Sequence, residues 1–169
     1  MDRDASHFCR RPEGAKDLQM PGTYSQILIH MVFSTKERRA SITPEIQPRL
    51  YDYIGGIVRA EKGALYAIGS MPDHVHILLR RRTNGAIADL MRTIKARSSL
   101  WVHQTFANVA AFAWQEGYSV FSVSKSAESD VKSYIENQLE HHKKRDFEEE
   151  LLTMLRAHAI QFEERYVFD

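Results

Sequence analysis

The alternation of short β-rich segments with longer helix-forming segments constrains the fold of this chain most strongly. Apolar residues recur at helical spacing in residues 43–62 and 86–106. Segments rich in β-branched and aromatic residues predict strands at 24–34, 64–70, 74–80 and 112–124. The order β-α-β-β-α-β predicts an α+β fold, a ferredoxin-like (RRM-like) antiparallel sheet with both helices on one face. We expect the other face of the sheet to be left free for a site.

The two ends of the chain differ from this pattern. Residues 1–22 mix charges, Gly and Pro without periodicity, which is typical of a disordered lead-in, and Met20 offers an alternative natural start. At the other end, residues 127–145 and 146–158 are both predicted to be helical. Because no internal repeat or low-complexity tract appears, we expect residues 23–169 to form one domain.

Composition excludes several classes of protein. The net charge is +1, from 23 Lys and Arg against 22 Asp and Glu, so bulk charge alone would not hold the protein on DNA. Cys9 is the only cysteine, which excludes a disulfide framework and favours a reducing cytoplasm. No apolar run approaches the roughly 18 residues of a membrane helix, and the first residues lack the apolar middle of a secretory signal.

The sequence His74-Val75-His76 lies in the third predicted strand. Because side chains alternate across a strand, both histidines point to one face while Val75 and Ile77 point to the other. Two imidazoles about 6–7 Å apart along a strand can both bind a divalent metal. A chance pair of surface histidines explains an isolated His-x-His motif equally well, so the motif needs a second observation.

Tyr134 and Gln138 supply that second observation. They are four residues apart in the predicted helix 127–145 and would share one helical face, which His141 and His142 extend. An isolated tyrosine in such a helix is more often a half-buried residue above a solvated face. Together with a histidine pair on the free face of the sheet, Tyr134 and Gln138 indicate a site.

These segments together resemble the single-tyrosine HUH transposases of the insertion-sequence 200/605 type and their REP-associated relatives. The resemblance covers about residues 23–169. It rests on several separate segments in the right order, YSQILIHMVFSTKERR, GSMPDHVHILL, IKARSS, WQEGYSVFSVS and YIENQLEHHKKRDFEEE.

The resemblance implies a role for each residue of the site. His74 and His76 would be two ligands of a divalent metal, Mg²⁺ or Mn²⁺, and Gln138 the third. Tyr134 would be the nucleophile that attacks a phosphodiester, giving a 5′-phosphotyrosine link and a free 3′-OH that later rejoins strands. Such an exchange conserves bond energy and needs no nucleotide cofactor. Mn²⁺ suits nitrogen ligands better than Mg²⁺ does.

The resemblance also implies the partners. The substrate would be single-stranded DNA with hairpin-bearing ends, and neither a small-molecule substrate nor a membrane is expected. The protein would be a homodimer in which the helix carrying Tyr134 completes the active site of either subunit. We expect it in the cytoplasm, associated with the nucleoid when bound to DNA.

Two other hypotheses stay open. The first is a domesticated, non-catalytic protein that keeps the fold and binds DNA hairpins, against which the intact His74, His76, Tyr134 and Gln138 argue. The second, more remote one is a replication-initiator or relaxase-type HUH nickase. Those enzymes often have more histidines near the metal, and many carry further domains.

Three basic clusters are candidates for contacts with DNA phosphates, although each is more commonly a solvated surface. The second of them leaves the strand that carries the two histidines, and Lys95 and Arg97 are weaker candidates. The clusters comprise Lys36, Arg38 and Arg39; Arg80, Arg81 and Arg82; and Lys143, Lys144 and Arg145.

The remaining candidates have simpler interpretations. Tyr118 competes as the nucleophile but is better explained by packing or base stacking, as is Trp114. His30 could lie near the histidine pair, although a hydrogen-bonded strand residue is the more common case. His103 and His158 are expected to be ordinary helix residues. The acidic residues Glu148, Glu149 and Glu150 point in different directions on a helix and are interpreted as an exposed turn.

Overall fold

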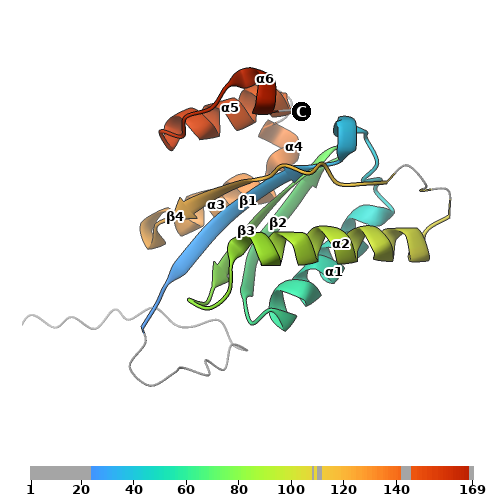
Figure 1. The fold of residues 1–169 in the computed structure, drawn as a ribbon, viewed down its shortest axis with the longest axis horizontal. Coiled ribbons are helices and arrows are strands. Elements are labelled where there is room, and N and C mark those ends of the chain that lie inside the picture. The colour runs from blue at the N-terminus through green and yellow to red at the C-terminus, as the bar shows by residue number, and fades with distance from the viewer. Residues whose placement is uncertain (1–23, 108, 110–111, 142–145, 168–169) are drawn as a thin grey trace, which may run out of the picture.

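The structure, a computed structural model, describes residues 24–107, 109, 112–141 and 146–167. Four strands form one antiparallel sheet in the order β2-β3-β1-β4, and the predicted ferredoxin-like fold is confirmed (Figure 1). The elements of this fold are β1 (Ile27–Ser34), α1 (Ile46–Ala60), β2 (Ala64–Met71), β3 (His74–Arg81), α2 (Ile87–Thr105) and β4 (Ser119–Val123). They are followed by α3 (Glu128–Glu136), α4 (Gln138–His141), α5 (Phe147–Ala157) and α6 (Glu164–Val167), with short 3-10 turns at Lys36–Arg38 and Lys125–Ala127.

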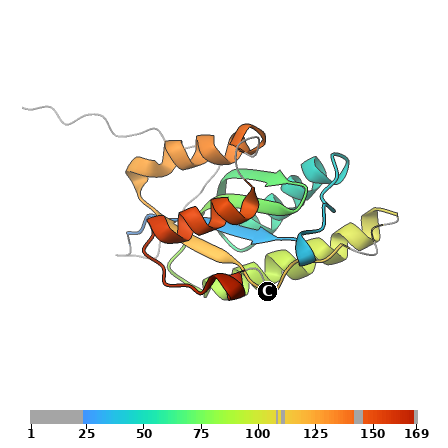
Figure 2. The same ribbon diagram turned by 90° about the horizontal axis from the view of Figure 1, so that it is seen from above.

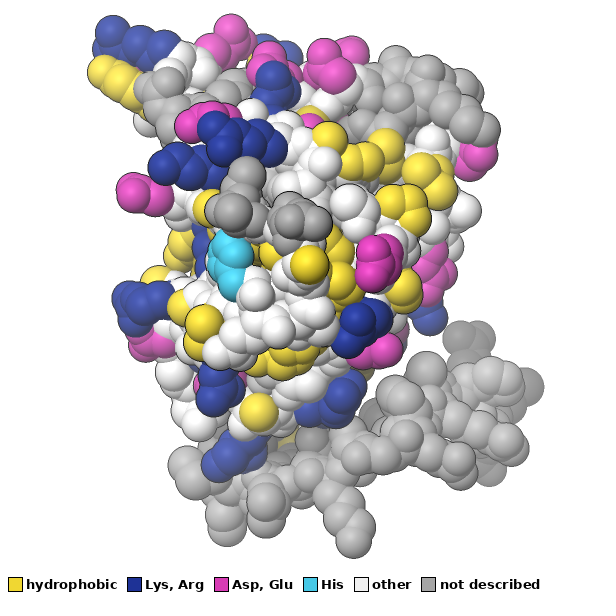
Figure 3. Space-filling view, turned by 90° about the vertical axis from the view of Figure 1, so that its right-hand side faces the viewer, with side chains coloured by type: hydrophobic (Ala, Val, Ile, Leu, Met, Phe, Trp, Pro, Cys, Tyr) yellow, Lys and Arg dark blue, Asp and Glu magenta, His cyan; other side chains and the backbone are white. Residues whose placement is uncertain are grey.

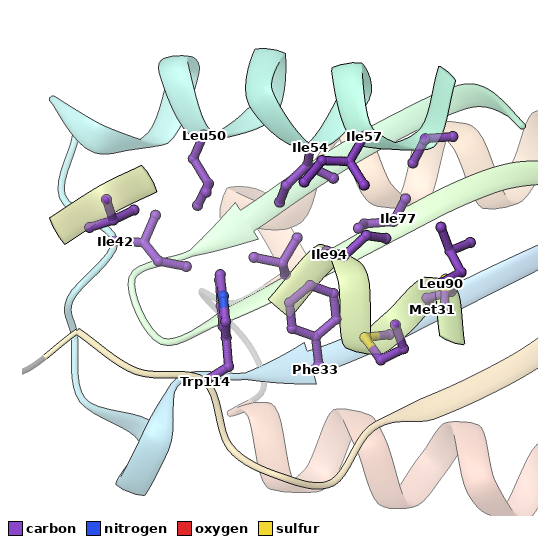
Figure 4. Packing of buried hydrophobic residues seen from close by; sticks show 14 of the residues in the cluster. Met31, Phe33, Ile42, Leu50, Ile54, Ile57, Ile77, Leu90, Ile94 and Trp114 are labelled. Carbon is purple, nitrogen blue, oxygen red and sulfur yellow. The ribbon is translucent and has the colours of Figure 1, made fainter. Parts of the chain in front are cut away.

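The main core lies between the sheet and helices α1 and α2. Every second residue of the central strands faces it, with Phe33 and Ile77 among the residues packed against Ile54 and Ile94 (Figure 4). At the start of α1, the backbone carbonyl of Thr43 accepts hydrogen bonds from the N–H groups of Ile46 and Gln47. Burial of this apolar face fixes the register of the strands, because a shift of one residue would turn every side chain over.

The second face of the sheet carries the histidines and is covered, not free. Helix α3 packs on β2 and β3 through Ile135, and α5 packs on β1 and β4 through Leu151 and Leu155 (Figures 1 and 2). The expectation of a free face is therefore wrong. The helices after β4 are amphipathic, and their apolar residues need a surface to cover.

The fourth strand is shorter than predicted. Of residues 112–124, only Ser119–Val123 form β4, and Trp114 makes an isolated bridge with Thr35. The chain between them lies outside the sheet, and the ammonium of Lys95 in α2 donates to its carbonyls at Gln115, Glu116 and Gly117 at 2.7, 3.0 and 2.7 Å. Burial lowers the pKa of Lys95 to about 8.

The helix predicted over 127–145 is interrupted. Helix α3 ends at Glu136, Asn137 has non-helical dihedral angles, and α4 begins at Gln138. The side chain of Asn137 donates to the carbonyl of Ser133 at 2.8 Å and so caps the C-terminal end of α3. Tyr134 and Gln138 therefore do not share one continuous helix, and the break changes the direction of the chain between them.

Gly69 of β2 allows α3 to approach the sheet. A Cβ atom at this position would lie 2.1 Å from the carbonyl oxygen of Ile135, a contact that only movement of the backbone could relieve. Gly69 lies opposite His76 on β3, so this close approach is next to the histidine pair. The absence of a side chain at Gly69 therefore fixes how closely α3, with Tyr134, lies against the strand of the histidines.

Replacing Gly69 with alanine is expected to lower the free energy of unfolding by about 1 to 3 kcal/mol, the usual cost of overpacking. Gly117→Ala is the matched control, because nothing lies within 4 Å of a Cβ there, and it should change stability by less than about 0.5 kcal/mol. Thermal unfolding followed by circular dichroism measures both. Equal midpoints for the two variants would contradict the tight packing of α3.

Several predictions fall outside the described residues, namely the lead-in at 1–22, His142, and the basic residues Lys143, Lys144 and Arg145. The division into a lead-in and a domain therefore stays a prediction. In the part of the chain that the structure describes, no helix is both long and apolar enough to cross a membrane.

Candidate functional site

His74 and His76 lie on the face of β3 that α3 and α5 cover. Both side chains are fully buried, and their ring centroids are 5.2 Å apart. The alternation predicted from the sequence is confirmed, because Val75 and Ile77 lie in the core on the other face. Phe147 of α5 stacks on His74 with a centroid distance of 4.2 Å. The pair is therefore an enclosed site, not a pair of surface histidines.

Asp73 orients the ring of His74. The Nδ1 atom of His74 donates to Oδ1 of Asp73 at 2.7 Å, so Nε2 is directed at Glu150. Burial raises the pKa of Asp73, but the hydrogen bond and charge of His74 and the charge of Arg38 outweigh it and hold that pKa below its ordinary value. A carboxylate behind an imidazole is the usual arrangement around a metal-binding histidine, since it fixes the tautomer.

His30 has the corresponding place behind His76. Its Nε2 atom lies 2.9 Å from Nδ1 of His76 on the neighbouring strand. Burial, reinforced by the nearby His76, lowers the pKa of His30 to about 3, so its ring is neutral at pH 7. A neutral His30 can accept the Nδ1–H of His76, the tautomer that directs the Nε2 lone pair of His76 towards Glu150. The expectation of a hydrogen-bonded strand residue is correct, and its partner is His76.

Glu150 of α5 lies against both histidines. Its Oε2 atom is 3.6 Å from Nε2 of His74 and 3.5 Å from Nε2 of His76, and its side chain is 6% exposed. The interpretation of the acidic run as an exposed turn is wrong for this residue. The Asp146 side chain caps α5 by accepting the N–H of Glu149, and this start places Glu150 on the buried face with Phe147.

Tyr134 and Gln138 reach the same carboxylate from the other side. The hydroxyl of Tyr134 donates to Oε1 of Glu150, and Nε2 of Gln138 donates to the same oxygen at 3.4 Å. The rings of Tyr134 and His76 are 6.0 Å apart. Although the helix breaks between them, the two side chains predicted to act together do converge, and Glu150 is the point where they meet.

The donor set fits a divalent cation. The ligand atoms of His74, His76 and Glu150 all lie within 4.8 Å of one another, and all three side chains are buried. The buried Oε1 of Gln138 has no hydrogen-bond partner among the described residues, while Nε2 of the same amide faces Glu150. In an octahedral Mg²⁺ site with bonds of about 2.1 Å, neighbouring ligand atoms are roughly 3 Å apart, closer than the 3.6 and 3.5 Å that separate Oε2 of Glu150 from Nε2 of His74 and of His76.

The competing candidates lie elsewhere. The ammonium of Lys95 lies 5.3 Å from the centroid of the Tyr118 ring. Tyr118 is therefore next to α2, on the other side of the sheet from Tyr134. Trp114 is buried in the main core and donates to Ser98. His103 bonds the carbonyl of Phe112, and His158 is an exposed residue beside Phe121, as expected for ordinary helix residues.

The basic residues have mixed surroundings. Arg38 pairs with Glu148 of α5 at 2.8 Å, and Arg39 pairs with Glu37. Arg81 is buried and donates to the carbonyl of Ala86 at 3.0 Å, so its guanidinium is committed to the turn before α2. On the face drawn in Figure 3, Lys and Arg are interspersed with acidic and apolar side chains.

Sequence reasoning missed the role of three residues of the site, namely Asp73, His30 and Glu150, although it had named His30 as a residue that could lie near the histidine pair. The position of Asp73 directly before His74 was a signal, because a carboxylate next to a metal histidine commonly orients it. His30 lies two residues before Val32, which pairs with His76, so its place beside His76 follows only once the register of β1 against β3 is known. The signal for Glu150 was the apolar spacing of Phe147, Leu151 and Leu155, which puts Glu150 on their face.

Comparison with known proteins agrees with this architecture. The chain is 25% identical over 122 residues to the ISDra2 transposase TnpA of Deinococcus radiodurans, covering 69% of this chain and 87% of that one. A crystal structure assigned as a transposase of D. radiodurans R1 matches with a TM-score of 0.55 and 26% identity, over 71% of this chain and 96% of that chain.

A REP-associated tyrosine transposase, solved bound to a REP hairpin, shares the fold with a TM-score of 0.53 at 17% identity, over 73% of each chain. The sequence model of the family described as "Transposase IS200 like" matches residues 23–138, which include β1 to β4, the histidine pair, Tyr134 and Gln138. The chain therefore belongs to the family of IS200-like transposases.

Proposed function

We propose that this transposase nicks and rejoins single-stranded DNA at hairpin-bearing ends through a 5′-phosphotyrosine intermediate, assisted by a divalent metal. The observation that carries the proposal is the convergence of Tyr134 with the buried pair His74 and His76 on one carboxylate. A tyrosine that serves only packing has no need of two oriented histidines beside its hydroxyl.

The proposed step exchanges one phosphodiester for another. The Tyr134 oxygen forms a bond to phosphorus while the bond from phosphorus to the 3′ oxygen breaks. The DNA 5′ phosphate is left on the tyrosine, and the proton lost from the phenol is balanced by the one gained at the 3′-OH. In the reverse direction, a 3′-OH attacks the phosphotyrosine and restores a continuous strand. A phenol, with a pKa of about 10, needs such a site to act as a nucleophile at neutral pH.

His74 and His76, with Gln138 as the third ligand, are the residues proposed to hold Mg²⁺ or Mn²⁺. The ion, when bound, polarises a phosphoryl oxygen and neutralises the charge that develops on the phosphate. Asp73 and His30 support this role, because each bonds the Nδ1 atom of one histidine and leaves its Nε2 facing the site. No nucleotide cofactor is needed, since the exchange conserves bond energy.

Hairpin DNA is the proposed partner, which fits the hairpin seen with the REP-associated relative of the same fold. Lys36, Arg38, Arg39, Arg80 and Arg82 are the described basic residues proposed to contact its phosphates. Arg81 is left out because its guanidinium is buried. We further propose a homodimer in which α3, with Tyr134, can complete either site, and a cytoplasmic location with binding to the nucleoid.

A covalent adduct tests the proposal directly. The full-length chain is incubated with Mn²⁺ and single-stranded DNA that carries hairpins from the ends of its own element, and the products are separated on a denaturing gel. We expect a protein–DNA species that survives denaturation and disappears on protease treatment. Binding of the hairpins in a gel-shift assay without any adduct would instead favour a domesticated, non-catalytic hairpin-binding protein.

A further inference from the structure

Glu150 lies outside the part of the chain that the family model matches, which ends at residue 138. We propose that Glu150 is an anionic ligand of the metal and also the residue that holds the Tyr134 hydroxyl beside it, so that helix α5 completes this chain's active site. This inference rests on the proposed function for its second half, the role towards Tyr134. Its first half concerns metal binding alone and can be tested without DNA.

The two oxygens of Glu150 have different neighbours. Oε2 faces the Nε2 atoms of His74 and His76 at 3.6 and 3.5 Å. Oε1 accepts hydrogen bonds from the hydroxyl of Tyr134 and from Nε2 of Gln138. One oxygen is therefore placed for a cation and the other for the nucleophile, within a single planar group.

The direction of the histidine rings supports the assignment. Both imidazoles have their Nδ1 atoms bonded behind the site, His74 to Asp73 and His76 to His30, and both present Nε2 to Oε2 of Glu150. Three ligand atoms from two elements thus lie around one point, all within 4.8 Å of one another. The alternative, a carboxylate that merely pairs with a histidine, would not require both Nε2 atoms to be directed at it.

A carboxylate changes the character of the site. Two imidazoles and an amide form a neutral set, whereas adding Glu150 gives a set with one negative charge. Mg²⁺ and Mn²⁺ favour carboxylate oxygen, so Glu150 would raise their affinity. Since the same carboxylate bonds the phenol, a bound ion and the Tyr134 oxygen would be held at a fixed separation, which is how positioning contributes to such reactions.

Helix α5 has other means of staying in place, so Glu150 can be replaced without unfolding it. Phe147, Leu151 and Leu155 pack with Val32 and Phe121 of the sheet. Glutamine has nearly the shape of glutamate, but its amide has one oxygen where the carboxylate has two, so it cannot serve the ion and the Tyr134 hydroxyl at the same time. Glu149→Gln is the matched control: it makes the same change one residue away, at an exposed position of the same helix.

The test is Mn²⁺ affinity, measured on the full chain without DNA by the electron paramagnetic resonance signal of free Mn²⁺. We expect Glu150→Gln to raise the dissociation constant about tenfold or more, because even outer-shell partners of a metal are worth 10- to 100-fold. Glu149→Gln should stay within about twofold of the parent. Unchanged or tighter Mn²⁺ binding in Glu150→Gln, with normal circular dichroism, would overturn the ligand assignment.

A second measurement separates this inference from the proposed function. Adduct formation is followed at Mn²⁺ concentrations that saturate each variant. If Glu150 also holds Tyr134, Glu150→Gln should remain slower than the parent at saturation, whereas Glu149→Gln should match it. Full recovery at saturation would overturn the second role. One further result would divide the two proposals: the parent forms no adduct, and Glu150→Gln still binds Mn²⁺ more weakly than the parent. The proposed function would then fail while the ligand assignment stands.

Discussion

Replacing Tyr134 with phenylalanine should reduce adduct formation at least about 10³-fold, because the change removes the proposed covalent nucleophile and leaves only the groups that bind the DNA. The change deletes one oxygen and keeps the ring that packs beside Ile135 in the cluster with Ala67 and Leu78. Fold and hairpin binding should therefore persist. Denaturing gels of the two proteins, run with the same DNA and Mn²⁺, measure the difference.

Tyr118→Phe is the matched control for this experiment. It removes the same atom from a tyrosine that packs on Lys95, on the side of the sheet that faces α2. We expect its adduct yield to equal that of the parent. An adduct that persists in Tyr134→Phe and vanishes in Tyr118→Phe would show that the nucleophile had been assigned to the wrong residue.

The histidine pair could be predicted from sequence because its geometry is local. Residues two apart on a strand share a face whatever surrounds them, so His74 and His76 needed only a correct assignment of β3. The ferredoxin-like order of elements was likewise accessible, since each strand and helix has its own periodic pattern. These features depend on residues close together in the sequence.

The rest of the site depends on contacts between distant elements. The position of Glu150 beside the histidines follows from how α5 docks on β1 and β4, which no local pattern of the acidic run shows. His30 joins the site through the register of β1 against β3. The break at Asn137 escaped because the helical pattern continues on both sides of it, although asparagine favours helix ends.

Removing the metal is expected to have the second large effect. Chelation with EDTA should lower adduct formation by the parent about 10²- to 10³-fold, the several kcal/mol that a Lewis-acid metal supplies. Added Mn²⁺ should restore it. In His76→Ala the loss should persist at Mn²⁺ concentrations that restore the parent, because one of the two proposed imidazole ligands is gone and His30 loses its hydrogen-bond partner.

His158→Ala serves as the control for His76→Ala, because His158 is exposed and lies at the end of α5, beside Phe121. Its adduct yield should rise with Mn²⁺ as in the parent. The two variants together separate loss of a ligand from general loss of a histidine. Since His76 is fully buried, its replacement also leaves a cavity, and unfolding midpoints must accompany the assay.

An adduct that forms equally well in EDTA would show that Tyr134 attacks without a metal. In that case the buried pair His74 and His76 would serve to orient Glu150 and the phenol instead of holding an ion.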